Sequence, residues 1–356
     1  MSHFQDNFTA QSAAVRVRFG AGVRKAVADE VRALGCSRAL ILSTPQQAAT
    51  AQEFADLCGP LAVGIYTNAT MHTPVAISDE AAAYAVKLGA DCVVAVGGGS
   101  TTGLGKAIAY RTDLPQIVVP TTYAGSEATP ILGQTEHGRK TTLTSAKVQP
   151  EVILYDAELV KTLPVAMTVT SALNAMAHAA EGLYAQNRSP ISTLMAVEGL
   201  QAFKDALPKV MADPADLTAR GETLYGAWLC GTVLGQVGMA LHHKLCHTLG
   251  GSFDLPHAET HAIILAHAMA YNAVAVPDLL APISEIFGGA PGMAIYNFAA
   301  AMQAPQALRD IGMKESDLDR AADLATQNPY WNPRPIEKVA VRQLLQAAWA
   351  GEPPAV

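Results

Sequence analysis

The sequence predicts an α/β N-terminal domain built on a parallel sheet, followed by an all-α C-terminal domain. Two observations support this division. Short apolar runs alternate with helical patterns over the first 160 residues, and after Tyr155-Asp156 the β-branched runs give way to helix-length segments rich in Ala, Leu, Met, Gly and His. We therefore expect a dinucleotide-binding domain over residues 1–160, a catalytic domain over residues 161–356, and a ligand cleft between them.

Buried strands are expected in the first domain, because its apolar runs are short and are bounded by Gly, Pro or Asp. Near-continuous apolar runs are typical of parallel strands that are buried on both faces. The helical patterns between these runs predict helices on both sides of the sheet. The expected strands are 39–42, 61–66, 92–96, 116–119 and 152–154, and the expected helices are 22–34 and 78–88.

Composition excludes several other classes of protein. Of 356 residues, 50% are hydrophobic and 15% are charged, which is the reverse of a disordered composition. The net charge is −7 without a dense basic run, so neither nucleic acid nor a membrane surface is expected as the main partner. Five scattered cysteines without a CxxC pair, and an N-terminus without a secretory pattern, predict a cytoplasmic protein with reduced thiols.

A glycine-rich turn follows the expected strand 92–96. Gly97, Gly98, Gly99 and Ser100 stand between this strand and a helical pattern over 104–110. Glycines allow backbone N–H groups to approach an anion closely, and the next helix presents its positive end. The pattern is neither a Walker A motif nor a strict GxGxxG. It predicts a dinucleotide phosphate site, and the alternative is a tight strand–helix turn without a ligand.

A second polar loop follows the strand 116–119 and contains Thr121, Thr122 and Ser126. Adjacent parallel strands end at the same edge of a sheet, so two such loops together can hold a pyrophosphate and its ribose. The alternative is a Ser/Thr-rich surface loop. After strand 39–42 the sequence Ser43-Thr44-Pro45-Gln46 offers neither an acid nor an arginine for the ribose, so both NADH and NADPH remain candidates.

Six of the ten histidines lie between positions 242 and 267. His243 and His247 are four residues apart and share one face of a helix, whereas His242 is expected to point elsewhere. Asn174 and His178 have the same spacing on an earlier helix, and if His243 and His257 meet them from another helix, the four side chains can build one site. Three imidazoles and a carboxylate would suit a transition metal, but a neutral amide at 174 favours a ring of hydrogen-bond donors and proton carriers. His261 and His267 are expected to be core or supporting groups.

These motifs resemble those of the iron-containing alcohol dehydrogenase family, which shares its fold with dehydroquinate synthase. The resemblance covers nearly the whole chain, including the glycine turn and the His243-x3-His247…Pro256-His257 pattern. It implies a metal held by an aspartate and three histidines, at positions matching Asn174, His178, His243 and His257. It also implies that the histidine matching His247 lies near the nicotinamide and that the lysine matching Lys140 lies near the cofactor ribose.

Asparagine at position 174 points to one branch of that family, since this and neighbouring segments are similar to the maleylacetate reductases. This resemblance implies NADH- or NADPH-dependent reduction of the carbon–carbon double bond of maleylacetate to 3-oxoadipate in aromatic compound degradation, without a required metal. We accordingly assign His243 and His257 to orienting or polarising the substrate, His178 to the same pocket, and His247 to proton delivery or nicotinamide contact. Asn174 and Lys244 are candidate contacts of the dicarboxylate substrate.

Three alternatives remain at this point. One is a metal-dependent alcohol dehydrogenase of the same family that acts on a small alcohol or ketone. Another is a lyase of the dehydroquinate synthase type, although we find no basic phosphate-reading pocket. The third is a nucleotide-binding or metal-buffering protein without catalytic activity. A homodimer is expected by analogy with the family.

Overall fold

The computed structural model describes residues 5–136, 139–328 and 330–355, except for the side chains of Arg139 and Lys140. The chain divides into two compact units. The sheet unit comprises Ser12–Leu163 and Ala215–Leu224, and the helical unit comprises the N-terminal residues up to Gln11, Pro164–Pro214 and Tyr225–Val356. The expected fold class is confirmed, and the single boundary at residue 160 stays a prediction.

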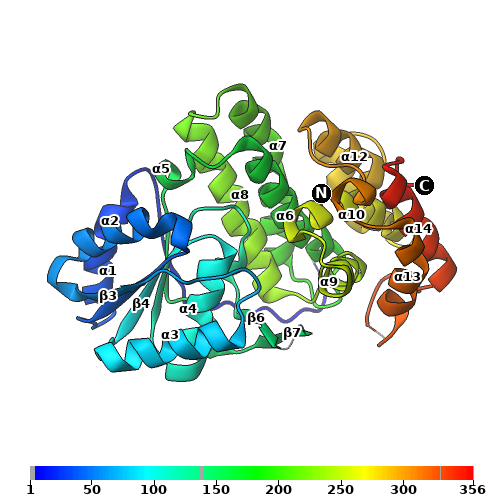
Figure 1. Ribbon diagram of the computed structural model, residues 1–356. Helices are drawn as coiled ribbons and strands as arrows, with labels where there is room; N and C mark the ends of the chain where they lie inside the picture. The colour runs from blue at the N-terminus through cyan, green and yellow to red at the C-terminus, as the bar shows by residue number, and fades with distance from the viewer. Residues whose placement is uncertain (1–4, 137–138, 329, 356) are drawn as a thin grey trace. The chain divides into compact units, whose positions relative to one another are not determined.

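A six-stranded parallel sheet forms the centre of the sheet unit (Figure 1), in the order β1-β8-β5-β4-β2-β3. All five expected strands are present. The apolar side chains of β2, β4, β5 and β8 are buried on both faces of the sheet, whereas β3 lies at its edge and is mostly half-buried. The strands are β1 (Arg16–Phe19), β2 (Ala39–Leu42), β3 (Ala62–Tyr66), β4 (Cys92–Gly97), β5 (Gln116–Pro120) and β8 (Val152–Tyr155). An antiparallel pair, β6 (Ile131–Glu136) and β7 (Arg139–Thr144), forms a separate small sheet.

Helices cover both faces of the large sheet, as expected. Alternate strand residues pack with α1 and α2 on one face and with α3 and α4 on the other. The predicted helix 22–34 begins instead with a 3₁₀ turn at Val23–Ala26. The helices of this unit are α1 (Val27–Ala33), α2 (Ala48–Cys58), α3 (Val75–Leu88), α4 (Gly99–Thr112) and α5 (Ala157–Val160).

Three strands were not expected from the sequence. β1 alternates arginine with apolar residues at the edge of the large sheet and is largely exposed, so it lacks the continuous apolar run of the other strands. β6 and β7 pair antiparallel and are rich in threonine and charged residues, so they also lack a continuous apolar run. A search of the sequence for apolar runs therefore does not detect an exposed edge strand or a polar pair of strands.

The helical unit consists of long helices packed against each other, and α6 is buried along almost its whole length from Thr168 to Tyr184. In the described residues no single helix meets the length and hydropathy expected of a membrane span; α8 and α9 pass only as a pair bent by 96°. The helices are α6 (Val165–Tyr184), α7 (Pro190–Ala212), α8 (Leu217–Gln236, of which the residues up to Leu224 belong to the sheet unit), α9 (Leu241–Phe253), α10 (His257–Ala273), α11 (Pro277–Phe287), α12 (Pro291–Ala301), α13 (Leu318–Thr326) and α14 (Lys338–Ala350).

Candidate active site

Three loops meet at the carboxyl edge of the large sheet, after the adjacent strands β2, β4 and β5. The side-chain amide of Gln47, after β2, donates a hydrogen bond of 3.0 Å to Oγ1 of Thr121, after β5. The chain leaves β2 toward α2 on one face and leaves β4 toward α4 on the other. Ligands of open α/β sheets bind at such a divergence of connections.

The glycine turn after β4 has the shape that an anion-binding turn requires. A Cβ atom on Gly97 would lie 2.3 Å from Oγ1 of Thr101, and one on Gly98 would lie 2.9 Å from Cγ2 of Thr122. Gly99 is exposed and would meet nothing within 4 Å. α4 begins at Gly99, and the first amides of a helix have no intrahelical acceptor. The turn therefore fits a cofactor pyrophosphate, through Gly97, Gly98, Gly99 and Ser100.

Lys106 joins the two expected cofactor loops and was not among the predicted site residues. Its ammonium group is buried and donates to the carbonyl oxygens of Ser126 (2.6 Å), Thr129 (2.7 Å) and Ile131 (2.9 Å). Burial lowers the pKa of Lys106 to about 7, against the opposing effect of the Glu127 charge. Lys106 thus fixes the loop that carries Thr121, Thr122 and Ser126. The predicted ribose contact Lys140 lies on β7, with a side chain outside the described residues.

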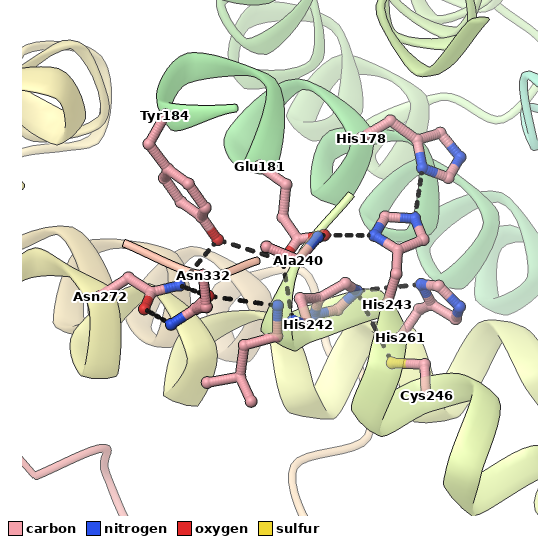
Figure 2. Close-up of polar contacts among 11 residues, drawn as sticks. His178, Glu181, Tyr184, Ala240, His242, His243, Cys246, His261, Asn272 and Asn332 are labelled. Carbon is pink, nitrogen blue, oxygen red and sulfur yellow. Dashed lines mark hydrogen bonds and ion pairs between the residues drawn. The ribbon is translucent and has the colours of Figure 1, made fainter. Parts of the chain in front are cut away.

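In the helical unit, six histidine rings form one cluster on α6, α9 and α10 (Figure 2 shows four of them). Ring centroids are 5.0 Å apart for His178 and His243, 5.2 Å for His243 and His261, and 4.3 Å for His261 and His257. The structure therefore brings together His178, His243 and His257, with His261 between the last two. The exposed His247 lies one turn beyond His243, at a ring distance of 6.2 Å.

His261 has a more central place than the sequence predicts, and His242 does not point elsewhere. His242 is fully buried, its ring lies 5.1 Å from that of His243, and its Nε2 lies 3.0 Å from Nδ1 of His261. Burial lowers the pKa of His242 to about 3 and lowers that of His261 well below its ordinary value, so both rings are neutral. The i,i+4 spacing of His257 and His261 is the signal that could have identified His261.

Glu181, also on α6, anchors this cluster. Its buried carboxylate accepts hydrogen bonds from the backbone N–H groups of Ala240 (2.9 Å) and His242 (2.8 Å), where α9 begins. It also accepts a bond from Tyr184 and lies 2.7 Å from Nδ1 of His243 (Figure 2). Burial alone would raise the pKa of Glu181, but the contact with His243 and the other donors lower it to about 2. Its position three residues after His178 is the only sequence signal for this role.

The two predicted substrate contacts lie on the helices that carry the cluster. Asn174 is buried on α6, one turn before His178, and among the described residues its Oδ1 accepts no hydrogen bond. Lys244 is half-buried on α9, with its ammonium 5.5 Å from the centre of the Tyr330 ring. A cation with one aromatic neighbour remains able to pair with a carboxylate.

The residues at the four metal positions of the family are a poor match for a tightly held divalent cation. Asn174 contributes a neutral amide, and the other three donors are neutral imidazoles, so the set lacks an anionic ligand. Nδ1 of His178 and Nε2 of His243 lie 2.9 Å apart in a hydrogen bond with each other. Glu181, the buried carboxylate that contacts His243 in the described part of the chain, is occupied by four donors.

Comparisons with known proteins agree with the fold. Two family models match, one described as iron-containing alcohol dehydrogenase over residues 14–157 and one described as the C-terminal part of the Fe-containing alcohol dehydrogenase family over residues 168–349. The chain belongs to the iron-containing alcohol dehydrogenase family. The prediction of an oxidoreductase of this family is confirmed.

Within that family the chain is similar to maleylacetate reductases. It is 59% identical to that of Rhizobium sp. (strain MTP-10005), covering 98% of this chain and 99% of the relative. It is 54% identical to that of Sphingobium indicum, covering 95% and 96%. The crystal structure of maleylacetate reductase from Agrobacterium tumefaciens matches with a TM-score of 0.96 at 58% identity, covering 98% of this chain and 100% of that one. The predicted resemblance to this branch is confirmed.

Proposed function

We propose that this chain reduces the carbon–carbon double bond of maleylacetate with NADH or NADPH and releases 3-oxoadipate, as a step in aromatic compound degradation. The observation that carries the proposal is the identity of 59% to a maleylacetate reductase over nearly the full length of both chains. The histidine cluster and the glycine turn support it, because they supply the groups that this reaction needs. The alternative of a metal-dependent alcohol dehydrogenase is less favoured, since Asn174 removes the anionic ligand.

The reaction places two demands on the protein. NADH or NADPH supplies a hydride when bound, and addition of the hydride at C2 of maleylacetate moves charge onto the ketone oxygen. Hydrogen-bond donors that stabilise this oxygen lower the barrier, and C3 must then receive a proton. We assign both tasks to the histidine cluster, with His178, His243, His247 and His257 as the predicted side chains. Lys244 and Asn174 are proposed to hold the substrate carboxylates.

The cofactor is proposed to bind to the sheet unit, with its pyrophosphate on residues 97–100 and its ribose near Thr121, Thr122, Ser126 and Lys140. The glycine cradle and the start of α4 support this placement. Neither an acid nor an arginine follows β2 at residues 43–47, so both nicotinamide cofactors are candidates. A homodimer in the cytoplasm is also proposed, and light scattering after gel filtration measures the oligomeric state.

The decisive experiment follows absorbance at 340 nm with purified, EDTA-treated protein, maleylacetate, and either NADH or NADPH. The expected result is cofactor oxidation with 3-oxoadipate as the product, identified by mass spectrometry. A simple ketone is tested in parallel and is expected to be a poor substrate. If maleylacetate is inert and the ketone is reduced only after addition of Fe²⁺ or Zn²⁺, the alcohol dehydrogenase alternative replaces the proposal.

A further inference from the structure

The side chain of Gln47 reaches from the loop after β2 to the loop after β5, past the glycine turn that follows β4. Gln47 ends a 3₁₀ turn at Pro45–Gln47, and its Nε2 donates a hydrogen bond of 3.0 Å to Oγ1 of Thr121. β4 lies between β2 and β5, so this bond spans the strand that carries the turn. A Cβ atom on Gly97, the first glycine of the turn, would lie 2.9 Å from Oε1 of Gln47. Glycine at position 97 therefore leaves the room that the Gln47 amide needs.

Thr121 is held from two sides, through its backbone and through its side chain. Its backbone N–H donates a hydrogen bond of 3.1 Å to the carbonyl oxygen of Gly97, and its hydroxyl oxygen accepts the bond from Gln47. The side chain of Thr121 is also buried. These contacts keep the Thr121 hydroxyl at a fixed place beside the first glycine of the turn.

The direction of the Gln47 amide decides what the Thr121 hydroxyl can do. Oε1 of Gln47 accepts a long hydrogen bond of 3.5 Å from the Thr44 hydroxyl, while Nε2 faces Thr121. A hydroxyl has one hydrogen and two lone pairs, so Thr121 accepts from Gln47 and keeps its hydrogen for a second partner. If the amide were turned around, Oε1 would face Thr121 and would take that hydrogen.

We propose that Gln47 is a positioning residue that fixes the Thr121 hydroxyl as a hydrogen-bond donor to an oxygen atom of the bound nicotinamide cofactor. This inference rests on the proposed function, which places the cofactor ribose near Thr121. A donor that is already aligned loses less conformational entropy when the ligand binds, so the expected effect is on cofactor affinity. Gln47 acts through Thr121 and does not have to touch the cofactor itself.

The direct test measures the dissociation constants of NADH and NADPH without substrate, by quenching of protein fluorescence. Thr121→Val removes the donor and is expected to raise the dissociation constant by about 5-fold or more. Thr121→Ser keeps the hydroxyl and should restore most of the affinity. If Thr121→Ser binds the cofactor as weakly as Thr121→Val does, the hydroxyl is not the group that matters and the proposal is wrong.

The second arm changes Gln47 itself. Gln47→Glu should also weaken cofactor binding by about 5-fold or more, because a carboxylate only accepts hydrogen bonds and takes the Thr121 hydrogen. Gln47→Met loses both amide groups without a new acceptor, so its Thr121 hydroxyl can still donate and its loss of affinity should be smaller. Gln52→Glu adds the same charge at an exposed position on α2 and is the control. An equal or larger loss in Gln47→Met would contradict the proposed direction of the bond.

A double-mutant cycle separates this role from a structural or a purely electrostatic one. In the Gln47→Glu background the hydroxyl hydrogen is already taken, so adding Thr121→Val should change the dissociation constant by less than about 2-fold. If Thr121→Val has its full effect in that background, the two side chains act independently and the proposal is overturned.

The outcome for the proposed function is separate, since these measurements need no maleylacetate. If the wild-type protein binds neither NADH nor NADPH, the proposed function fails and this inference fails with it. If the wild-type protein binds a cofactor and the Gln47 and Thr121 variants bind it equally well, only this inference is overturned.

Discussion

Nζ of Lys106 lies 2.6 Å from the carbonyl oxygen of Ser126, and this bond links the helix after the glycine turn to the second cofactor loop. The same ammonium group also holds the carbonyl oxygens of Thr129 and Ile131. Both parts of the proposed cofactor site therefore depend on one buried side chain.

Lys106→Met is expected to destabilise the sheet unit and to weaken cofactor binding. Each buried carbonyl that loses its donor costs about 1–3 kcal/mol in the free energy of unfolding. Urea denaturation measures this loss, and quenching of protein fluorescence by NADH measures the dissociation constant. Lys161→Met, which changes an exposed lysine in the same unit, is the control. Equal stability of the two variants would contradict the assigned role of Lys106.

Gly97→Ala and Gly99→Ala are expected to differ, although they change neighbouring positions. The new methyl group at 97 would lie 2.3 Å from Oγ1 of Thr101, whereas the one at 99 would meet nothing within 4 Å. Overpacking typically costs about 1–3 kcal/mol, so Gly97→Ala should unfold at a lower temperature and bind NADH more weakly. In thermal unfolding without cofactor, the melting temperature of Gly99→Ala should be close to that of wild type. Similar melting temperatures for both variants would refute the crowded-turn description.

Asn174→Asp is expected to increase the affinity of the helical unit for a divalent metal. The substitution adds the anionic ligand that His178, His243 and His257 lack. After incubation with Zn²⁺ and gel filtration, elemental analysis should find about one metal ion per chain in the variant and much less in wild type. The variant should also melt at a lower temperature without metal, because a buried carboxylate without a partner is costly. Equal metal retention by both proteins would contradict this prediction.

Lys244→Met is expected to raise the KM for maleylacetate by about 10-fold or more, which is the typical effect of losing a charge-assisted hydrogen bond. The KM for NADH should stay unchanged, since the cofactor is proposed to bind to the sheet unit. Lys244→Arg retains the charge and should recover part of the affinity. Steady-state kinetics with each substrate varied in turn distinguish these outcomes, and an unchanged KM for maleylacetate would remove Lys244 from the substrate site.

His267 is expected to make folding stability depend on pH. Burial lowers its pKa from 6.5 to about 4, so the unfolded chain binds this proton more readily than the folded chain does. The stability that it contributes is present above pH 6.5 and is lost as the pH falls toward 4, at about 1.4 kcal/mol per pH unit. In urea denaturation between pH 7.5 and 5, His267→Gln should show a smaller loss of stability than wild type. Parallel curves for the two proteins would exclude the effect.

The sequence by itself determined the parallel sheet, the helical second half and the shared helix face of His243 and His247, because these depend on local patterns, whereas the meeting of His178, His243 and His257 depends on the packing of α6, α9 and α10. Apolar runs of Val and Ile require burial on both sides, and a spacing of four places two side chains on one helix face. Tertiary structure decided the hydrogen-bond partners. Lys106 and Glu181 lie in helical segments whose local sequence is equally compatible with an exposed or a buried charged side chain. Only long-range packing buries these two side chains. A buried charge must then find partners, so Lys106 collects carbonyl oxygens and Glu181 collects the N–H groups that begin α9.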